Sequence, residues 1–482
     1  MRRIRNPLVE HWIDLELQLK RRSFTSSHHR RRRLPLVIIL WSFLVRMRRG
    51  PIPDDVDVDD DGVPRKGKVV TTTGGWPELL RCTTTKPPPI LLDELIAEIL
   101  LRIPARSLIP LRNSVCSSWR TLISSSQFAK DHLRRSMAVD PGLSHPLMAY
   151  YSQTYRYPII GVFSVRSVME NAPHEPTKVV PYEGRRFRLI IGSCNGLLCL
   201  HDEERQDGFI ISHRAMLWNP CTGFTSQPLE IEGLLCICGF GYDHVNDKYK
   251  LFAILDNKSR MFTFGPKSTW RTIQDFSRNF RDGNYRGCLV NHVGLFVSGT
   301  GTLNWLFHRY LSFVWVLSLD LVKETFNQFS LPNRDSDDDH RVTPQLGILR
   351  DCLAVCYETK KTHWTVWLMK EYGVPQSWTK LAIIPHHPLL GRRPLSLRPI
   401  YMLKDVLLAI APSGKFVLCN LNDGSIDIPN IDSSTDGMPK LCPLTRNVSA
   451  RKFQLYHESL VSPFHFGLPS CSSEMRLIKP SL

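Results

Sequence analysis

The stretch ILLDELIAEILLRIPARSLIPLRNSVCSSWRTLI, residues 90–123, contains short runs in which apolar residues repeat at helical spacing. Leu91, Leu95 and Ile99 recur every four residues, which places them on one face of a helix. Pro104 is expected to end this first run, because proline cannot continue a helix without losing a hydrogen bond. The pattern therefore predicts an amphipathic helix that needs an apolar partner.

Further short helices are predicted downstream of this run. Ser107 is a predicted N-cap for a second helix, residues 115–123 have the spacing of a third, and the basic run SSSQFAKDHLRRS (124–136) predicts one more. Three short helices in fewer than about 40 residues rarely close a core by themselves. Their surplus apolar surface must therefore pack against something else.

This arrangement resembles the F-box, the adaptor-binding motif of Skp–cullin–F-box ubiquitin ligases. The resemblance rests on DELIAEILLRIP, then SL, then VCSSWRTLI, in that order and near the family's spacing. It implies docking on a Skp adaptor through the residues at the matching positions, which are Leu91, Leu95, Ile99, Pro104, Leu108, Val115, Trp119 and Leu122. Leu92 stands where the family usually has proline, Pro110 falls inside the second helix, and one extra residue lies between Leu111 and Trp119. The alternative is a helical hairpin that packs only against its own chain.

From about residue 146 to residue 428 the helical period is replaced by short apolar or alternating runs between Gly, Asn, Asp and Pro, which predicts many antiparallel strands. The strand candidates are LIIGSC (189–194), GLLCLHD (196–202), AMLWNP (215–220), ICGFGYD (237–243), KYKLFAIL (248–255), FVWVLSLD (313–320), DCLAVCYE (351–358), WTVWLMK (364–370), VLLAIAP (406–412) and KFVLCNL (415–421). The tight turns expected between strands are at Asn195-Gly196, Thr222-Gly223, Asp282-Gly283, Ser413-Gly414 and Asp423-Gly424.

The length of this region favours a β-propeller. Roughly 280 residues at about 40 to 50 residues per blade correspond to six or seven blades, and radial closure leaves no long exposed sheet edge. A large two-sheet sandwich is the alternative. The fold class expected is α+β and multidomain, with a small three-helix module followed by a large all-β domain, a kelch-like β-propeller.

The β region also resembles a family, the F-box-associated domain that follows the F-box in many plant proteins. The segments that carry the resemblance are GSCNGLLCL (192–200), LWNPCTG (217–223), GFGYDHVNDKYKL (239–251), GTLNWL (301–306), LSLDLVKETFNQFSLP (317–332), LGILRDCLAVCYE (346–358), WTVWLMKEYGVPQSWTKL (364–381) and PIYMLKDVLLAIAPSGKFVLCNL (399–421). Trp218 and Trp305 are expected to be large anchors between sheets, and Asn219-Pro220 is expected to end a strand.

Changes in composition divide the chain into four parts. Residues 1–85 form a basic leader and linker without a recognisable fold, and its apolar run at 34–45 is shorter than the roughly 20 residues that span a bilayer. A signal-anchor or membrane-surface helix is the alternative for that run. Residues 86–136 form the F-box-like module, 146–430 the β domain, and 431–482 a partly ordered C-terminal tail.

The chain carries a formal net charge of +17, and residues 1–85, with 17 Lys and Arg against 10 Asp and Glu, supply 17 − 10 = +7 of it. No recognised nucleic-acid motif accompanies this charge, so nucleic-acid binding is not expected. The cluster at 30–33 is a candidate nuclear-localisation signal. The expected location is cytoplasmic, nuclear or both.

Thirteen cysteines in apolar runs indicate buried reduced thiols rather than a disulfide framework. Cys236 and Cys238 lack partners at zinc-site spacing, and the acidic run at 335–340 lacks the pattern of a calcium loop, so no metal site is expected. His201-Asp202 is expected at a turn and His386-His387 in a loop, without a recognised nucleophile motif. No catalytic residue and no cofactor are therefore predicted.

These observations predict a non-enzymatic substrate-recognition adaptor of a Skp–cullin–F-box ubiquitin ligase. Its partners would be a Skp-type adaptor, a cullin through that adaptor, and a client protein held by loops of the β domain that the sequence does not identify. A membrane partner is not expected. Two alternatives remain: a β-propeller protein-binding module that does not engage the ligase, and a propeller enzyme with a metal or cofactor in its central channel.

Overall fold

The computed structural model describes residues 93–463 except residue 115 and the segments 139–146, 153–158, 171–177, 182–186, 207–208, 234, 257, 267–268, 274–292, 310–312, 334–342, 361, 387–396, 412–415 and 430–452. Several predicted features lie outside the described residues: the leader, Leu91, Val115, the acidic run at 335–340 and the turns at Asp282-Gly283 and Ser413-Gly414.

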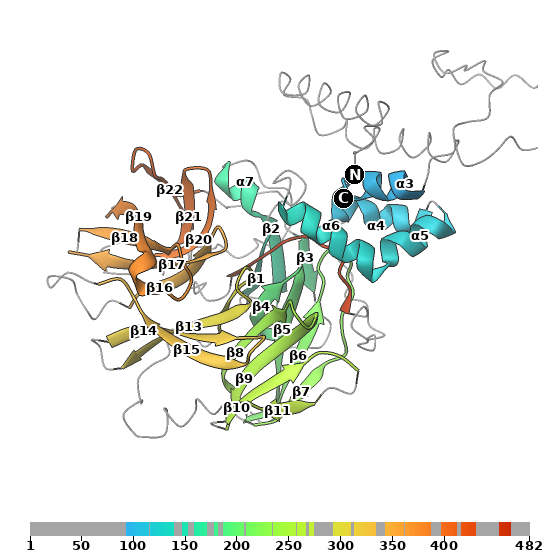
Figure 1. The fold of residues 1–482 in the computed structure, drawn as a ribbon, viewed down its shortest axis with the longest axis horizontal. Coiled ribbons are helices and arrows are strands. Elements are labelled where there is room, and N and C mark those ends of the chain that lie inside the picture. Colours follow the sequence, from blue (N-terminus) through green and yellow to red (C-terminus); the bar gives the residue numbers. More distant parts are fainter. Residues whose placement is uncertain are drawn as a thin grey trace, which may run out of the picture. The chain divides into compact units, whose positions relative to one another are not determined.

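Short helices occupy the first part of the described chain (Figure 1). They are α3 (Asp93–Leu100), α4 (Ala105–Ser114), α5 (Ser117–Ser124) and α6 (Ser126–Ala138). Helix α7 (Val165–Met169) and the 3-10 helix η2 (Pro375–Ser377) come later, between strands. The prediction that Ser107 caps the second helix is wrong. The Pro104 carbonyl already accepts hydrogen bonds from the Ser107 and Leu108 amides, at 2.9 and 3.2 Å, so Ser107 lies in the first turn of α4.

Among the described residues, 93–99 with 114, 116 and 117 belong to one unit, and 100–113 with those from 118 onward belong to a second. Helix α3 up to Ile99 therefore belongs to a different unit from α4, α6 and the β domain. On α3 the predicted apolar residues Leu95 and Ile99 are half-buried, and Asp93 and Glu94 are exposed.

The described part of the β domain consists of six four-stranded antiparallel sheets, each with the strand order given by its hydrogen bonds. The first three are β24 (Phe453–Tyr456), β1 (Leu147–Ser152), β2 (Ile159–Ser164) and β3 (Lys178–Pro181); β4 (Phe187–Cys194), β5 (Leu197–Gln206), β6 (Phe209–Trp218) and β7 (Leu229–Ile231); and β8 (Leu235–Asp243), β9 (Lys248–Leu255), β10 (Lys258–Thr263) and β11 (Trp270–Thr272). The other three are β12 (Leu295–Val297), β13 (Thr302–Arg309), β14 (Phe313–Asp320) and β15 (Thr325–Ser330); β16 (Gln345–Leu349), β17 (Cys352–Thr359), β18 (His363–Met369) and β19 (Trp378–Pro385); and β20 (Arg398–Leu403), β21 (Val406–Ile410), β22 (Phe416–Asn420) and β23 (Ile426–Asp427).

These sheets succeed one another as the blades of a β-propeller (Figure 1). Their first strands pack side by side, and a parallel bridge joins Cys238 of β8 to Val293, just before β12. Six separate sheets exclude the large two-sheet sandwich. Every predicted strand candidate lies in or overlaps a strand of these sheets.

The ring closes through strand β24, which pairs with β1 from Leu147↔Tyr456 to Tyr150↔Phe453. The predicted β domain ended at residue 430, so this boundary requires a correction: a strand from the predicted tail completes the first blade. The paired residues lie 303 to 309 positions apart, from 453 − 150 and 456 − 147, and no local sequence pattern indicates such a pairing. Pairing the two ends of the domain removes the free edge that β1 would otherwise expose.

In the five blades from β4–β7 to β20–β23, the first-to-second and third-to-fourth strand connections lie on one side of the ring, which we call the turn face. In the first blade, the end of β24 and the start of β1 lie on this side. Connections of neighbouring blades bond to one another there. The Asp351 carboxylate, between β16 and β17, accepts hydrogen bonds from the Ser298 and Gly299 amides between β12 and β13, at 3.1 and 2.6 Å. Arg350 donates to the Lys404 carbonyl of the next blade at 3.0 Å. These bonds fix adjacent blades in register.

Both predicted aromatic anchors, Trp218 and Trp305, are fully buried, and Trp305 lies between two blades. Trp305 packs in the cluster shared by the β8–β11 and β12–β15 sheets, and its indole nitrogen donates to the Cys238 carbonyl at 3.2 Å. Strand β6 ends at Trp218 as predicted, and the Asn219 side-chain oxygen accepts from the Cys221 amide at 2.8 Å. Trp305 therefore combines apolar burial with a hydrogen bond to the neighbouring blade, whereas Trp218 is held by burial.

The predicted turn at Asn195-Gly196 is confirmed, since both residues have positive φ, 53° and 81°. The placement of His201-Asp202 at a turn is wrong. Strand β5 continues to Gln206, because His201 and Asp202 pair across the sheet with Ala215 and Arg214. The polar run after Leu200 resembles a loop in sequence but continues the sheet in the structure.

Candidate functional site

The eight predicted adaptor-binding residues differ in exposure. Pro104 is exposed, and Leu95, Ile99 and Leu122 are half-buried, so part of each side chain can reach a partner. Leu108 and Trp119 are 0% and 4% exposed. Leu91 and Val115 lie outside the described residues. The six described positions therefore divide into four with exposed surface and two inside the helical region.

Helices α4 and α6 contact the turn face of the β domain through charged side chains. Arg106 of α4 forms an ion pair with Glu458, just after β24. The Arg112 guanidinium of the same helix lies over the Phe224 ring, 5.4 Å from its centroid. Lys130 of α6 forms an ion pair with Asp247, in the β8–β9 connection. Three blades therefore contribute to the attachment of these helices.

The Lys130–Asp247 contact extends into the β domain through Tyr242, whose hydroxyl donates to the Asp247 carboxylate. Burial alone would raise the pKa of Asp247, but hydrogen bonds from Lys130 and Tyr242 hold it below its ordinary value. Burial and the same carboxylate raise the pKa of Tyr242. Asp247 is therefore ionised and Tyr242 protonated at neutral pH, the states that this contact requires.

Within the helical region, His132 of α6 bonds through Nε2 to the Ile103 carbonyl at 2.8 Å. Burial lowers the pKa of His132, against the effect of this carbonyl, so the ring is neutral and Nε2 is the donor at neutral pH. The bond ties α6 to the connection between α3 and α4.

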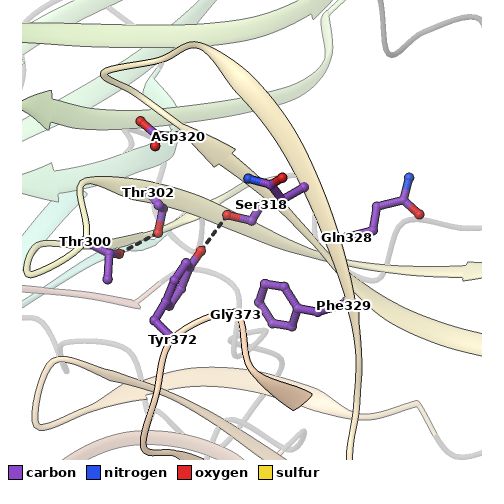
Figure 2. Close-up of a pocket in the computed structure, with 9 residues that line it drawn as sticks. Thr300, Thr302, Ser318, Asp320, Gln328, Phe329, Tyr372 and Gly373 are labelled. Carbon is purple, nitrogen blue, oxygen red and sulfur yellow. Dashed lines mark hydrogen bonds between the residues drawn. The ribbon is translucent and has the colours of Figure 1, made fainter. Parts of the chain in front are cut away.

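A pocket of about 410 Å³ opens on the turn face, between two blades (Figure 2). Its lining residues belong to the β12–β13 connection, to strands β13, β14 and β15, and to the β18–β19 connection; they are Thr300, Thr302, Ser318, Asp320, Asn327, Gln328, Phe329, Tyr372 and Gly373. No helix residue is among them. Two neighbouring blades therefore form a site that the attached helices leave open.

A hydrogen-bond network joins the walls of this pocket (Figure 2). The Tyr372 hydroxyl is bonded to Ser318 Oγ at 2.5 Å and to Asn304 Oδ1, below the pocket, at 2.6 Å. Thr300 and Thr302 are joined through their hydroxyls at 2.8 Å. Burial raises the pKa of Tyr372, so it stays a neutral phenol. The lining is thus rigid and polar, and Asp320 is the one charged residue among those that line it.

Other candidates for chemistry have structural explanations. Among the cysteines whose side chains the structure describes, none forms a disulfide, and burial raises the pKa of Cys238 and of Cys419 to about 12, so both are inert thiols. His386 bonds to the buried Glu358 carboxylate at 3.0 Å beside Trp364. Among the residues the structure describes, no three His, Cys, Asp or Glu side chains gather as metal ligands. In the same residues, no helix is both long and apolar enough to cross a membrane.

A ring of four-stranded blades of this size defines a β-propeller domain, and the comparisons with known proteins place it in a family. Residues 176–462 match the F-box associated beta propeller domain, and since this is more than half of the 482 residues, the chain belongs to that family. The match includes strand β24, in agreement with the closure of the ring. The predicted F-box-associated β domain is thereby confirmed.

Individual relatives are plant F-box proteins. An F-box/kelch-repeat protein of Arabidopsis thaliana is 28% identical over 390 residues, covering 77% of this chain and 95% of the relative. F-box protein CPR1 of the same plant is 24% identical over 330 residues, covering 65% and 77%. Among solved structures, TolB from Acinetobacter baumannii aligns with 69% of this chain and 73% of its own at a TM-score of 0.37 and 8% identity, which is too distant to add to the assignment.

Proposed function

We propose that this protein is the substrate-recognition adaptor of a Skp–cullin–F-box ubiquitin ligase. The observation that supports this role is its membership of the F-box-associated propeller family, with relatives that are F-box proteins. The helical region ahead of the propeller, with its F-box-like sequence, is the proposed docking module for the Skp adaptor. The β domain is the proposed client-binding part.

In this proposal the adaptor contacts the exposed and half-buried members of the predicted set, namely Leu95, Ile99, Pro104 and Leu122, together with Leu91 and Val115. Leu108 and Trp119 support the site from inside, because they are already buried in this chain. Completing the burial of a Leu or Ile side chain contributes up to about 1.5–3 kcal/mol. Four to six such positions can offset the free-energy cost of association, about 4–15 kcal/mol.

The contacts of α4 and α6 with the turn face fix these two helices on the propeller. Arg106–Glu458 and Lys130–Asp247 attach them to two separate blades. In this proposal the adaptor docks on the helical region and the client binds the propeller of the same chain. Holding two reactants together raises their effective concentration without any bond-making group on the bridge. We therefore infer a non-catalytic subunit, which acts in the cytoplasm or nucleus without nucleic-acid or membrane partners.

The proposal is tested by affinity capture of the tagged full-length chain from plant cells under proteasome inhibition. The variant Leu95→Glu/Ile99→Glu places two charges on the proposed docking surface, and Met137→Glu is the matched control, because Met137 is an apolar residue of α6 that is 51% exposed and outside the predicted set. We expect the wild type and the control to capture a Skp-type adaptor and a cullin, and the double variant to lose both while keeping its client.

The competing function is a propeller that binds proteins without engaging the ligase. Leu92 at the usual proline position and Pro110 inside α4 favour it, because both depart from the family pattern at the docking module. Capture of clients but of no adaptor by the wild-type chain would support this second function and overturn the first.

A further inference from the structure

The pocket between the β12–β15 and β16–β19 blades carries a carboxylate that its own turn does not require. Asp320 ends strand β14, and its Oδ1 accepts hydrogen bonds from the Val322 and Lys323 amides, both at 2.9 Å. Asn219 and Asn420 stand at the ends of the corresponding third strands of two other blades. Their side-chain oxygens accept from Cys221 and Asn422 amides at 2.8 and 3.0 Å. A neutral amide therefore caps this turn equally well, and the negative charge of Asp320 is available for another role.

The second oxygen of Asp320 is only weakly engaged. Lys323 Nζ is 4.0 Å from Oδ2, and the Lys323 side chain is 76% exposed. An exposed ion pair at this distance contributes little and is readily exchanged. Oδ2 can therefore accept hydrogen bonds from a ligand in the pocket.

The buried hydroxyl groups of the pocket direct their protons toward one another. The Asn304 amide nitrogen faces the Leu295 and Thr302 carbonyls, at 3.3 and 3.4 Å, and these acceptors fix the orientation of the side chain. Asn304 Oδ1 must then accept from the Tyr372 hydroxyl, and since a phenol has a single proton, Ser318 must donate to Tyr372.

The hydroxyl protons of the two threonines also have fixed directions. Thr302 Oγ1 accepts from the Asn304 amide nitrogen at 3.1 Å. Thr300 Oγ1 lies 3.4 Å from the Val297 carbonyl, which can only accept, so Thr302 donates to Thr300. Ser318 and Thr300 therefore have no proton left to donate to a ligand, and their oxygens can only accept, as can the carboxylate of Asp320. This part of the lining pairs with a group that brings only donors.

We propose that this pocket binds a cationic side chain, the guanidinium of arginine or the ammonium of lysine, presented by the client. This inference rests on the proposed client-binding function and gives the chemistry of the recognised group. Both cations carry N–H donors and no acceptor, which matches the lone pairs of Ser318 and Thr300 and the Asp320 carboxylate. Tyr372 and Phe329 add aromatic surface, which attracts cations.

The size and position of the pocket suit a side chain that projects from a protein surface. A volume of about 410 Å³ lies in the range of sites that enclose small ligands. Asn327 and Gln328 are exposed at its rim, and their amide groups can bond to the backbone of a bound segment. The exposed Val374, next to Gly373, provides an apolar contact outside the pocket.

The test measures binding of blocked amino acids to the full-length chain by saturation-transfer NMR. The probes are Nα-acetyl-arginine amide, Nα-acetyl-lysine amide and, as a neutral isostere, Nα-acetyl-citrulline amide, with glucose as a neutral polyol. The variants are Asp320→Asn and, as a matched control, Asp423→Asn, because Asp423 is an exposed carboxylate in the third-to-fourth strand connection of another blade. We expect the two cations to bind and citrulline not to bind, with affinity reduced about tenfold or more in Asp320→Asn alone.

Three results would overturn the inference: equal binding of citrulline and arginine amides, preference for glucose, or unchanged cation binding in Asp320→Asn. If Asp320→Asn unfolds at the same urea concentration as the wild type, its loss of cation binding is not caused by misfolding. Asp320→Asn should still capture the Skp-type adaptor, since it is remote in sequence from the docking module. If the wild-type chain binds the cations but captures no adaptor, the ligase role is wrong and the pocket proposal stands. If it captures the adaptor but binds no cation, the pocket proposal is wrong and the ligase role stands.

Discussion

Replacing Lys250 by methionine should destabilise the β domain by about 3 kcal/mol or more, because it breaks a buried charge network between two blades. The Lys250 side chain is 5% exposed and lies 2.8 Å from the carboxylates of Asp243, fully buried, and of Glu324 in the next blade. Its ammonium also donates to the Leu321 carbonyl at 2.5 Å. Removing one partner of a buried pair typically costs about 3–5 kcal/mol.

The lower end of that range applies because the remaining acids keep other partners. Asp243 still accepts from the Val245 and Asn246 amides at 3.1 and 3.0 Å, and Glu324 still pairs with Arg271. In the double variant Lys250→Met/Asp243→Asn no uncompensated charge stays buried at position 243, so at least half of the lost stability should return. Lys323→Met, at a lysine that is 76% exposed, is the control and should change stability by less than about 0.5 kcal/mol.

The assay is urea unfolding of the full-length chain followed by tryptophan fluorescence. Burial alone would raise the pKa of Asp243 and of Glu324, but their hydrogen bonds and the Lys250 charge hold both pKa values below the ordinary 3.8 and 4.5. The stability that the ionised Asp243 and Glu324 contribute is therefore complete above the ordinary pKa values, and it is lost as the pH falls through their lowered pKa values in the folded protein. Without Lys250 the folded pKa values rise, so acid unfolding should begin at a higher pH. A loss below about 1 kcal/mol in Lys250→Met, or a double variant no better than the single one, would refute the reasoning.

Three further predictions concern the helices, a turn and the closure of the ring. Burial lowers the pKa of His132 from 6.5, so the stability that the neutral ring contributes should be complete above about pH 6.5 and should be lost as the pH falls through the folded pKa. The amides of α6, corrected for intrinsic rates, should therefore exchange hydrogen faster at pH 5 than at pH 7.5. Gly196→Ala should cost about 1–3 kcal/mol in urea unfolding, because φ is +81° and the new Cβ would lie 2.2 Å from Ser459 Oγ; an unchanged midpoint would contradict it. Phe453→Ala should cost about 3–5 kcal/mol and expose the domain to limited proteolysis, since Phe453 is 2% exposed and packs edge-on against Phe416; proteolysis at the wild-type rate would count against closure through β24.

The sequence predicted the parts of this structure that depend on local patterns. Alternation and turn residues identified the strands, and Asn195-Gly196 identified a hairpin turn, because each depends on residues that are neighbours in the chain. The large residues Trp218 and Trp305 were recognisable as anchors for the same reason.

Features made by distant segments were not predictable in this way. Strand β24 pairs with β1 across nearly the whole domain, and the pocket joins Thr300, Asp320 and Tyr372 from three separate connections and strands. Asp320 resembled an ordinary turn residue in sequence. The strand order within the blades places Asn219 and Asn420 at the positions that correspond to Asp320. Because these neutral side chains cap the same kind of turn, the turn does not require the charge of Asp320.

The central claim is that this chain connects a client to a ligase through its helical module, and the most direct measurement is calorimetric titration of the purified full-length protein with a purified Skp-type adaptor. We expect a one-to-one complex that Leu95→Glu/Ile99→Glu abolishes and Met137→Glu leaves unchanged. If the wild type and the control are both folded but neither gives a detectable heat of binding, the claim is contradicted.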